Sequence, residues 1–583
     1  MSSAGNTPEQ HIVAADYVAG NLSEAERQVA EAHLAGCAQC QTAVDAVRQL
    51  EAGNASQNTR ALVNYVADLL ASTVMLVAPV ANQLSQPPPP KPLEPEVEPA
   101  PFFEPLRVLQ PRVAAGAKNM RRFVGRFGLV LLLTILVLLL PQPEGLSDAG
   151  HRALAAFVFT GSILALEPVS LPIAALMVPL ALVALNVADT TIAFEPFSRP
   201  VVFLILASLF LAEGLRKHGL TRRLALQTLV FAGGRVPYVL LGIMLIAGLF
   251  SMWVENTATA AVLIPVALTV ASQVPDPDKA KGLLILLVMG IAYSASLGGM
   301  ATVMGAGSNA VAAGFLQEVQ SFSFVDWMRV GLPAFILLFP ITWLLLLRLI
   351  KVDIKIIDVT PVQRQLKEMG PMSPAERELA GVMAVTIVLW VGGSFLEPAL
   401  NLPNTLLAPS MVAIMAVAYL AIRGIINWED VKGVSWGIFF TIGAGLALGD
   451  ALSRTGATDW FAGLINPLVT GPPLVVSLLL LIYLSALLTN VMNNTTIAAV
   501  FVPILIALAV ADTSLNPVLL VMAVTLATTF GYSLPSASGR MALVSASGIV
   551  RAKDMMRYGL VATLISALIL GLYFYVSSVL GIV

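Results

Sequence analysis

Two short polar stretches inside apolar sequence carry residue types that bind ions. Residues 253–265 read WVENTATAAVLIP and residues 491–503 read VMNNTTIAAVFVP, so Asn-Thr, Ala-Ala-Val and Pro recur in register 238 positions apart. Free amide groups at a helix start favour an anion, whereas exposed carbonyl and side-chain oxygens favour Na⁺. Two such helix starts that face each other would hold a dianion between two cations. The alternative is that each Asn-Thr pair only caps a helix in a loop.

The composition places these stretches in a membrane protein. The chain has 583 residues, of which 57% are hydrophobic and only 12% are charged, whereas soluble domains carry about 25% charged residues. Apolar stretches long enough to cross roughly 30 Å of hydrocarbon recur along most of the chain. We therefore predict an all-α polytopic membrane protein with about ten or eleven crossings and additional re-entrant segments. The net charge of −2 gives no indication of nucleic-acid binding, and polar residues 1–60 predict no secretory signal peptide.

Other landmarks recur at nearly the same distance as the polar stretches. The segment FLAEGLRKHGLTRRLA at 210–225 matches ALGDALSRTGATDWFA at 447–462, and GAGSN at 305–309 matches ASGRM at 537–541. Landmarks in the same order predict a duplicated membrane domain, and matching helix breaks in two halves are typical of transporter binding sites. The predicted divisions are a first repeat at 118–349, a cytoplasmic linker at 350–377 and a second repeat at 378–583.

The N-terminal region carries a separate metal-binding pattern. Cys37 and Cys40 are the only cysteines of the chain, and they follow His33 in EAHLAGCAQC. Two thiolates and an imidazole at this spacing suit one tetrahedral Zn²⁺, with His11 as the candidate fourth ligand. Residues 1–55 resemble the zinc-binding anti-sigma-factor domain, which implies a sigma factor or another cytoplasmic protein as partner. The alternative is a helical hairpin whose two thiols bind no metal.

The chain between this domain and the first crossing indicates its sidedness. Residues 56–117 are predicted to form an amphipathic helix followed by a Pro-rich spacer, QPPPPKPLEPEVEPAPFFEP. Positive residues directly before a first crossing favour the cytoplasmic side, and here they are Lys118, Arg121, Arg122 and Arg126. Thiols remain reduced in the cytoplasm, so Cys37 and Cys40 as zinc ligands favour the cytoplasmic side as well. We expect a multi-pass protein of the inner membrane with a cytoplasmic N-terminus.

The membrane region, residues 120–583, resembles the divalent anion/sodium symporter family of dicarboxylate, citrate and sulfate carriers. The segments that carry the resemblance are SMWVENTATAAVLIP, LLTNVMNNTTIAAVFVP, GIAYSASLGGMATVMGAGSNAV and FGYSLPSASGRMALVSASG. The resemblance implies inverted repeats with re-entrant hairpins, a homodimer, and an elevator motion of a transport domain against a scaffold. The substrate-binding residues that it implies are Asn256, Thr257, Asn494, Thr495 and Gly539.

The resemblance also implies two cation sites that couple transport to Na⁺. The members of the first site would be Ser251, Glu255, Asn256 and the carbonyl of Gly305. The members of the second would be Thr489, Asn494 and the carbonyls of Met492 and Ala537.

Two charged residues depart from the family pattern. Glu255 stands where the first motif has Ser, as Asn493 does in the second, and Arg540 enters a loop that is normally uncharged. An intramembrane charge is costly and is usually paired or functional. Glu255 and Arg540 would form a structural ion pair, or Arg540 would bind a substrate carboxylate or sulfate in bidentate fashion. A third interpretation is that Glu255 titrates and couples transport to H⁺ instead of Na⁺.

These features support two hypotheses for function. The first is a secondary transporter of small divalent anions, with a C4-dicarboxylate as the leading substrate. The second is a membrane sensor, whose transporter-like body detects an anion and whose finger binds a cytoplasmic partner. The membrane region carries no nucleophile–base pair, catalytic metal motif or nucleotide loop, so we do not expect an enzyme.

Overall fold

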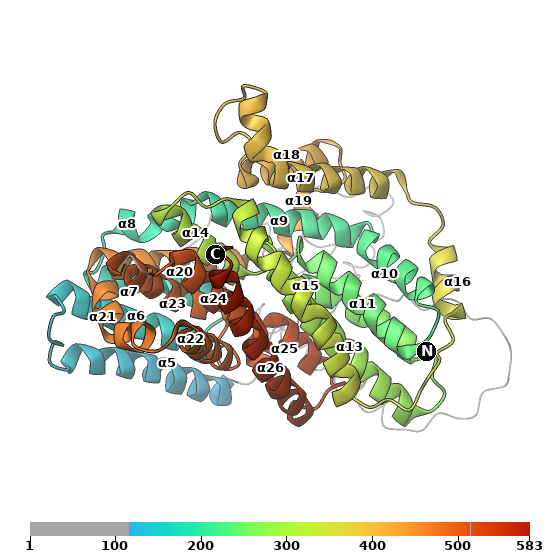
Figure 1. The fold of residues 1–583 in the computed structure, drawn as a ribbon, viewed down its shortest axis with the longest axis horizontal. Coiled ribbons are helices and arrows are strands. Elements are labelled where there is room, and N and C mark those ends of the chain that lie inside the picture. Colours follow the sequence, from blue (N-terminus) through green and yellow to red (C-terminus); the bar gives the residue numbers. More distant parts are fainter. Residues whose placement is uncertain (1–115, 513–514, 583) are drawn as a thin grey trace, which may run out of the picture. The chain divides into compact units, whose positions relative to one another are not determined.

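The membrane region consists of helices joined by short loops (Figure 1). The computed structural model describes residues 116–512 and 515–582. This part of the chain contains no β-strand, only an isolated bridge between Arg235 and Ile356, which confirms the all-α prediction. The predicted zinc ligands, the amphipathic segment and the Pro-rich spacer lie outside the described residues.

The first half contains the helices that precede and build the first polar stretch. In chain order these are α5 (Gly116–Leu139), α6 (Asp148–Leu166), α7 (Leu171–Ala184), α8 (Thr190–Phe194), η2 (Glu195–Ser198), α9 (Pro200–Lys217), α10 (Leu220–Phe231), α11 (Val236–Ser251), α12 (Asn256–Ala271), α13 (Pro277–Gly299), η3 (Val303–Gly305), α14 (Gly307–Val319) and α15 (Phe324–Leu349). A linker with one short helix, α16 (Thr360–Glu368), follows.

The second half repeats this order. Its elements are α17 (Pro374–Ala399), α18 (Pro409–Ile422), α19 (Trp428–Lys432), α20 (Trp436–Arg454), α21 (Ala457–Thr470), α22 (Leu474–Leu488), α23 (Asn494–Ala511), α24 (Pro517–Ala527), η4 (Thr528–Phe530), η5 (Pro535–Ala537), α25 (Gly539–Ala546) and α26 (Ala552–Val579). The turn between α9 and α10 and the turn between α20 and α21 both use a left-handed glycine, Gly219 and Gly456, each with φ of 73°. Only glycine adopts this conformation at little cost, so a glycine at the same place in both halves favours the same turn in each.

Side-chain caps fix where several helices begin. At α17, the Ser373 hydroxyl accepts from the Glu376 amide at 3.1 Å, and the Glu376 carboxylate accepts from the Ser373 amide at 2.7 Å. This reciprocal pair is a capping box, and Ser373-Pro-Ala-Glu376 carries its Ser-x-x-Glu signature. Ser323 and Asp326 form the same arrangement at the start of α15.

Seven of the described helices are long and apolar enough to cross a membrane, or eight if the bent pair 190–198 and 200–217 counts as one crossing. The protein is therefore a multi-pass membrane protein. The number is smaller than the ten or eleven crossings predicted from hydropathy. The physical reason is that polar breaks divide apolar sequence into pieces such as α11 and α12, each with 16 residues, whereas a crossing needs about 20.

The helices form two groups that each combine both halves of the chain and that meet at α23, which packs on α20 as well as on α14 and α24. In one group α13 packs on α11, α12 and α15, α15 packs on α26, and α22 and α23 pack on α24. In the other group α5, α6 and α7 pack in sequence, α20 packs on α7, and α18 packs on α9 and α17. The polar break at the start of α12 belongs to the first group, and the break at the start of α23 lies where the two groups meet, so the candidate site stands at that place.

A buried ion pair attaches the linker to the membrane helices. Arg223 on α10 and Glu376 on α17 are 5% and 4% exposed, and the guanidinium Nε lies 3.1 Å from the carboxylate. The same guanidinium donates to the carbonyls of Gly370 at 2.7 Å and Met369 at 3.2 Å. One side chain thus fixes α10, the end of the linker and the start of α17.

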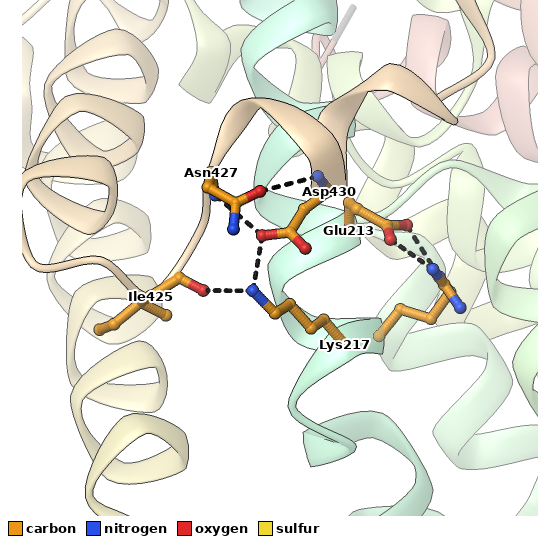
Figure 2. A network of polar contacts seen from close by, with 6 residues as sticks. Glu213, Lys217, Ile425, Asn427 and Asp430 are labelled. Atoms are coloured by element: carbon orange, nitrogen blue, oxygen red, sulfur yellow. Dashed lines mark hydrogen bonds and ion pairs between the residues drawn. The ribbon is translucent and has the colours of Figure 1, made fainter. Parts of the chain in front are cut away.

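A second polar network holds the end of α9 against the α18–α19 connection (Figure 2). The Lys217 ammonium donates to the Asp430 carboxylate at 2.6 Å and to the Ile425 carbonyl at 3.3 Å. The Asn427 amide also donates to Asp430, at 2.8 Å. Burial raises the pKa of Asp430, but the hydrogen bonds from Lys217 and Asn427 and the positive charges nearby outweigh it, so the pKa lies below its ordinary value.

Replacing Asp430 by asparagine is expected to reduce the free energy of unfolding at pH 7 by less than about 1 kcal/mol, because the ion pair is partly exposed to solvent. A carboxylate with a depressed folded-state pKa stabilises above its unfolded pKa of about 3.9 and loses that contribution as the pH falls through the folded-state pKa. The difference in thermal stability between wild type and Asp430→Asn should therefore vanish in acid. Glu429→Gln on the same helix is the control. A difference that persists at about pH 2 would contradict the assignment.

Candidate functional site

The first polar stretch is a helix start capped by its own carboxylate. Glu255 precedes α12, and its Oε2 accepts from the Thr257 amide at 2.7 Å and the Ala258 amide at 3.1 Å. Its Oε1 accepts from the Thr257 hydroxyl at 2.9 Å. The carboxylate therefore uses free amides of this helix start that would otherwise be available to an anion.

The second polar stretch is capped in the same way by a neutral side chain. Asn493 precedes α23, and its side-chain oxygen accepts from the Thr495 amide at 2.9 Å. Both motif positions that differ from serine are thus N-caps. The Asn-Thr pairs themselves, to which the capping alternative referred, lie inside α12 and α23, and Asn256 and Asn494 make other contacts.

The structure brings together three members of the first predicted cation site. With its amide nitrogen turned toward them, Asn256 donates to the Ser251 hydroxyl at 2.5 Å and to the carbonyls of Gly305 at 2.7 Å and Ala295 at 3.0 Å. Asn256 and Ser251 are 2% and 0% exposed. The fourth predicted member, Glu255, bonds to the helix start instead.

The second predicted cation site is arranged in parallel. The Thr489 hydroxyl donates to the Asn494 side-chain oxygen at 2.7 Å and to the Thr528 carbonyl at 2.9 Å. A Cβ added to Gly531 would lie 3.1 Å from both the Thr489 carbonyl oxygen and the Ala537 Cβ, and 3.4 Å from the Asn494 oxygen. Thr489, Asn494 and Ala537 therefore surround one glycine. The fourth predicted member, Met492, lines a neighbouring cavity.

The helix start of each half contacts the glycine loop of the other half. A Cβ at Gly539, in the second half, would lie 2.7 Å from the Thr257 hydroxyl in the first half. A Cβ at Gly307, in the first half, would lie 2.7 Å from the Thr495 hydroxyl in the second half. Each helix start of one half thus meets the loop of the other half, and glycine permits the close approach. This crossed arrangement places the four predicted substrate-binding residues Asn256, Thr257, Asn494 and Thr495 around one region.

The buried Arg540 stands in the same loop as Gly539. Its side chain is 2% exposed, one terminal nitrogen donates to the Thr529 carbonyl at 2.9 Å, and Nε has no hydrogen-bond partner. Within the described residues, no ion pair within 4.0 Å joins Arg540 to Glu255, whose carboxylate is engaged by α12. The structural ion pair is therefore not formed, and a buried guanidinium retains an unsatisfied donor.

The membrane region matches a known family. A family model described as the sodium:sulfate symporter transmembrane region matches residues 121–582. The chain belongs to this family. A second model, for a zinc-finger, matches residues 14–41 and so contains His33, Cys37 and Cys40, while His11 precedes the match.

The chain is similar over most of its length to known bacterial transporters. A sodium-dependent dicarboxylate transporter of Staphylococcus saprophyticus is 29% identical over 481 residues, which cover 78% of this chain and 92% of the relative. An uncharacterized transporter of Haemophilus influenzae is 29% identical over 448 residues, covering 76% of this chain and 94% of the relative. Among solved structures, the Alcanivorax borkumensis YdaH transporter aligns with a TM-score of 0.44 at 14% identity, covering 80% of this chain and 98% of that one.

Further residues of the candidate site were not identified in the sequence analysis. Tyr293 and Tyr532 come from opposite halves and stack with ring centroids 4.1 Å apart, both fully buried and with hydroxyls that lack a partner. Asn490 accepts from the Tyr532 and Ser533 amides at 3.1 and 2.8 Å and so holds the second loop. The repeated Tyr-Ser in GIAYSASLGG and FGYSLPSASG was the signal that could have identified the tyrosine pair.

A small cavity opens beside the second motif. Its volume is about 160 Å³, and its lining includes Arg126 on α5, Glu167 after α6, and Met492, Asn493 and Ser536. This volume accommodates about five water molecules or one small anion. Its lining combines residues of α5 and the end of α6 with residues beside the start of α23.

Proposed function

We propose that the protein is a secondary active transporter of small divalent anions, with a C4-dicarboxylate as substrate and Na⁺ as coupling ion. The observation that carries the proposal is the crossed arrangement, in which Thr257 meets Gly539 and Thr495 meets Gly307. Each helix start also stands beside a separate cluster of buried side-chain and carbonyl oxygens. Family membership and relatives named for sodium-dependent dicarboxylate transport support the same conclusion.

Electrostatics explains why transport would be coupled. A dianion in a site of low dielectric is unfavourable unless positive charge stands close by. Na⁺ at the Ser251–Asn256–Gly305 cluster and at the Thr489–Asn494–Ala537 cluster supplies two such charges. In this proposal the substrate carboxylates accept hydrogen bonds from the side chains of Asn494 and Thr495. Thr257 and Asn256 join them by exchanging their present acceptors, Glu255 and the Gly305 carbonyl, for the substrate. Substrate without Na⁺ would bind weakly, so the two move together.

The added charges of this chain balance one another. Glu255 contributes one negative charge and Arg540 one positive charge. The net charge of the site is therefore the same as it would be without these two residues. Arg540 stabilises the anion in this proposal, and Glu255 offsets it while capping α12.

The motion that we propose is an elevator, in which the group of α11–α15 and α22–α26 slides against the remaining helices. Arg199, at the start of α9, lies 2.5 Å from Glu318 on α14 and 2.6 Å from Asp450 on α20, so it joins the two groups. The proposal includes inverted repeats over 118–349 and 378–583, a homodimer, and an inner-membrane protein with a cytoplasmic N-terminus.

Uptake of succinate by purified protein in proteoliposomes tests this function. Uptake driven by an imposed Na⁺ gradient, and not by a H⁺ gradient, is the expected result. Uptake driven only by H⁺ and abolished in Glu255→Gln would instead make Glu255 the coupling group. Absence of uptake under either gradient, with sulfate and citrate also inactive, would contradict the transport proposal.

A second candidate function rests on the zinc-finger match at residues 14–41. In that proposal, Zn²⁺ is held by His33, Cys37, Cys40 and His11, and the finger binds a sigma factor or another cytoplasmic protein. The transporter-like body would then report the presence of an anion. Capture of a partner by the full-length protein, lost in Cys37→Ser, would support this role beside transport.

A further inference from the structure

We propose that a groove between the start of α11, the end of α15 and the linker binds the headgroup of an anionic phospholipid. The groove has a volume of about 530 Å³ and is lined by Arg235, Tyr238, Trp343, Lys355 and Ile356, among others. It shares no residue with the candidate ion and substrate site. The binding site therefore goes beyond the proposed transport function.

Backbone contacts give the groove a fixed wall. The linker pairs with the start of α11, since the Val236 amide donates to the Lys355 carbonyl at 3.2 Å and the Ile357 amide donates to the Gly234 carbonyl at 2.8 Å. Gly234 has φ of 79°, and a Cβ there would lie 2.4 Å from the Ile357 carbonyl oxygen. The glycine thus permits the linker to lie against the helix start.

An aromatic side chain that also lines the groove is fixed by a hydrogen bond. The Trp343 indole N–H on α15 donates to the Pro237 carbonyl at 3.0 Å. Trp343 and Tyr238 both line the groove. Tryptophan and tyrosine are enriched at the level of the lipid headgroups, where their rings contact both apolar and polar surroundings.

The groove presents positive charge without a protein partner. Arg235 and Lys355 are exposed, and neither side chain makes a hydrogen bond or ion pair with any residue between 123 and 582 that the structure describes. Asp353, the nearest acidic residue along the linker, makes no ion pair with either of them. Two adjacent cations with no carboxylate are complementary to a phosphate group.

The surroundings of the groove favour a lipid over a soluble phosphate. Phe231, at the end of α10, is 94% exposed, and Ile356 on the linker is 70% exposed. Large apolar side chains this exposed would be unfavourable in water but suit the acyl chains of a lipid. A soluble anion would contact the two cations alone. A lipid would contact the two cations with its headgroup and Phe231 and Ile356 with its acyl chains.

Binding of a spin-labelled phosphatidylglycerol to the full-length protein in detergent tests this site. Arg235→Gln/Lys355→Gln should weaken binding about 30-fold, because each cation near a lipid surface contributes about a factor of five. Arg364→Gln/Lys367→Gln, which removes the same charge from α16, is the matched control and should leave binding unchanged. The charge-preserving Arg235→Lys/Lys355→Arg should bind nearly as wild type, which separates loss of charge from loss of folding.

Three competitors identify the occupant. Unlabelled phosphatidylglycerol should displace the probe, whereas phosphatidylcholine and inorganic phosphate at the same concentration should not. Displacement by inorganic phosphate would show a soluble-anion site and overturn the proposal. Equal weakening in the α16 control would show a diffuse charge effect and overturn it as well.

Discussion

Replacing Arg540 by glutamine is expected to reduce Na⁺-driven succinate uptake about 100-fold or more. The substitution removes the one positive charge that offsets Glu255, so an uncompensated carboxylate remains beside the proposed dianion site. In a site of low dielectric an opposite charge acts even without direct contact, and a 100-fold loss corresponds to about 2.7 kcal/mol, since every 1.4 kcal/mol is a factor of ten. Uptake in proteoliposomes at matched protein density measures the effect, with thermal unfolding as the check on folding.

The double variant Glu255→Gln/Arg540→Gln separates two explanations of that loss. If charge balance is what matters, removing both charges should restore much of the uptake, because glutamine can still accept from the amides of α12. If Arg540 contacts a substrate carboxylate directly, the folded double variant should remain as inactive as the single one. Full uptake in Arg540→Gln would show that the guanidinium has neither role.

Much of the candidate site was predictable because the chain repeats it. The duplicated Asn-Thr stretches located both helix starts, and the duplicated loops located Gly305 and Ala537 near them. Duplication works as a signal here because a binding site between two repeats needs the same polar break in each. The capping box at Ser373 was predictable for a more local reason, since both partners lie within one helical turn.

Other features depend on three-dimensional contacts that no local pattern specifies. Nothing in the sequence states that Gly539 approaches Thr257 instead of its own half's Thr495, because the crossing arises from how the repeats pack. The sequence likewise did not specify the hydrogen-bond partners of Glu255. In the structure its carboxylate accepts from the free amides at the start of α12. Hydropathy also does not show the helix length that a polar break leaves, so several described apolar helices are shorter than one crossing.

Replacing Glu376 by glutamine is expected to reduce the free energy of unfolding by about 3–5 kcal/mol, since it leaves the Arg223 guanidinium buried without a counter-charge. Both side chains are nearly inaccessible to solvent, and Arg223 also holds the carbonyls of Met369 and Gly370. Denaturant or thermal unfolding in detergent measures the change. Glu368→Gln, an exposed position on the linker helix, is the control and should be close to neutral.

The pair variant Arg223→Met/Glu376→Leu shows what the ion pair contributes. Desolvating two charges is costly, so well-packed apolar side chains in their place are often as stable as the original pair. If the double variant unfolds like wild type but transports poorly, the pair serves to fix the linker and α10 in one arrangement. If Glu376→Gln is itself as stable as wild type, the carboxylate is not required by Arg223, and the two linker carbonyls suffice to hold the guanidinium.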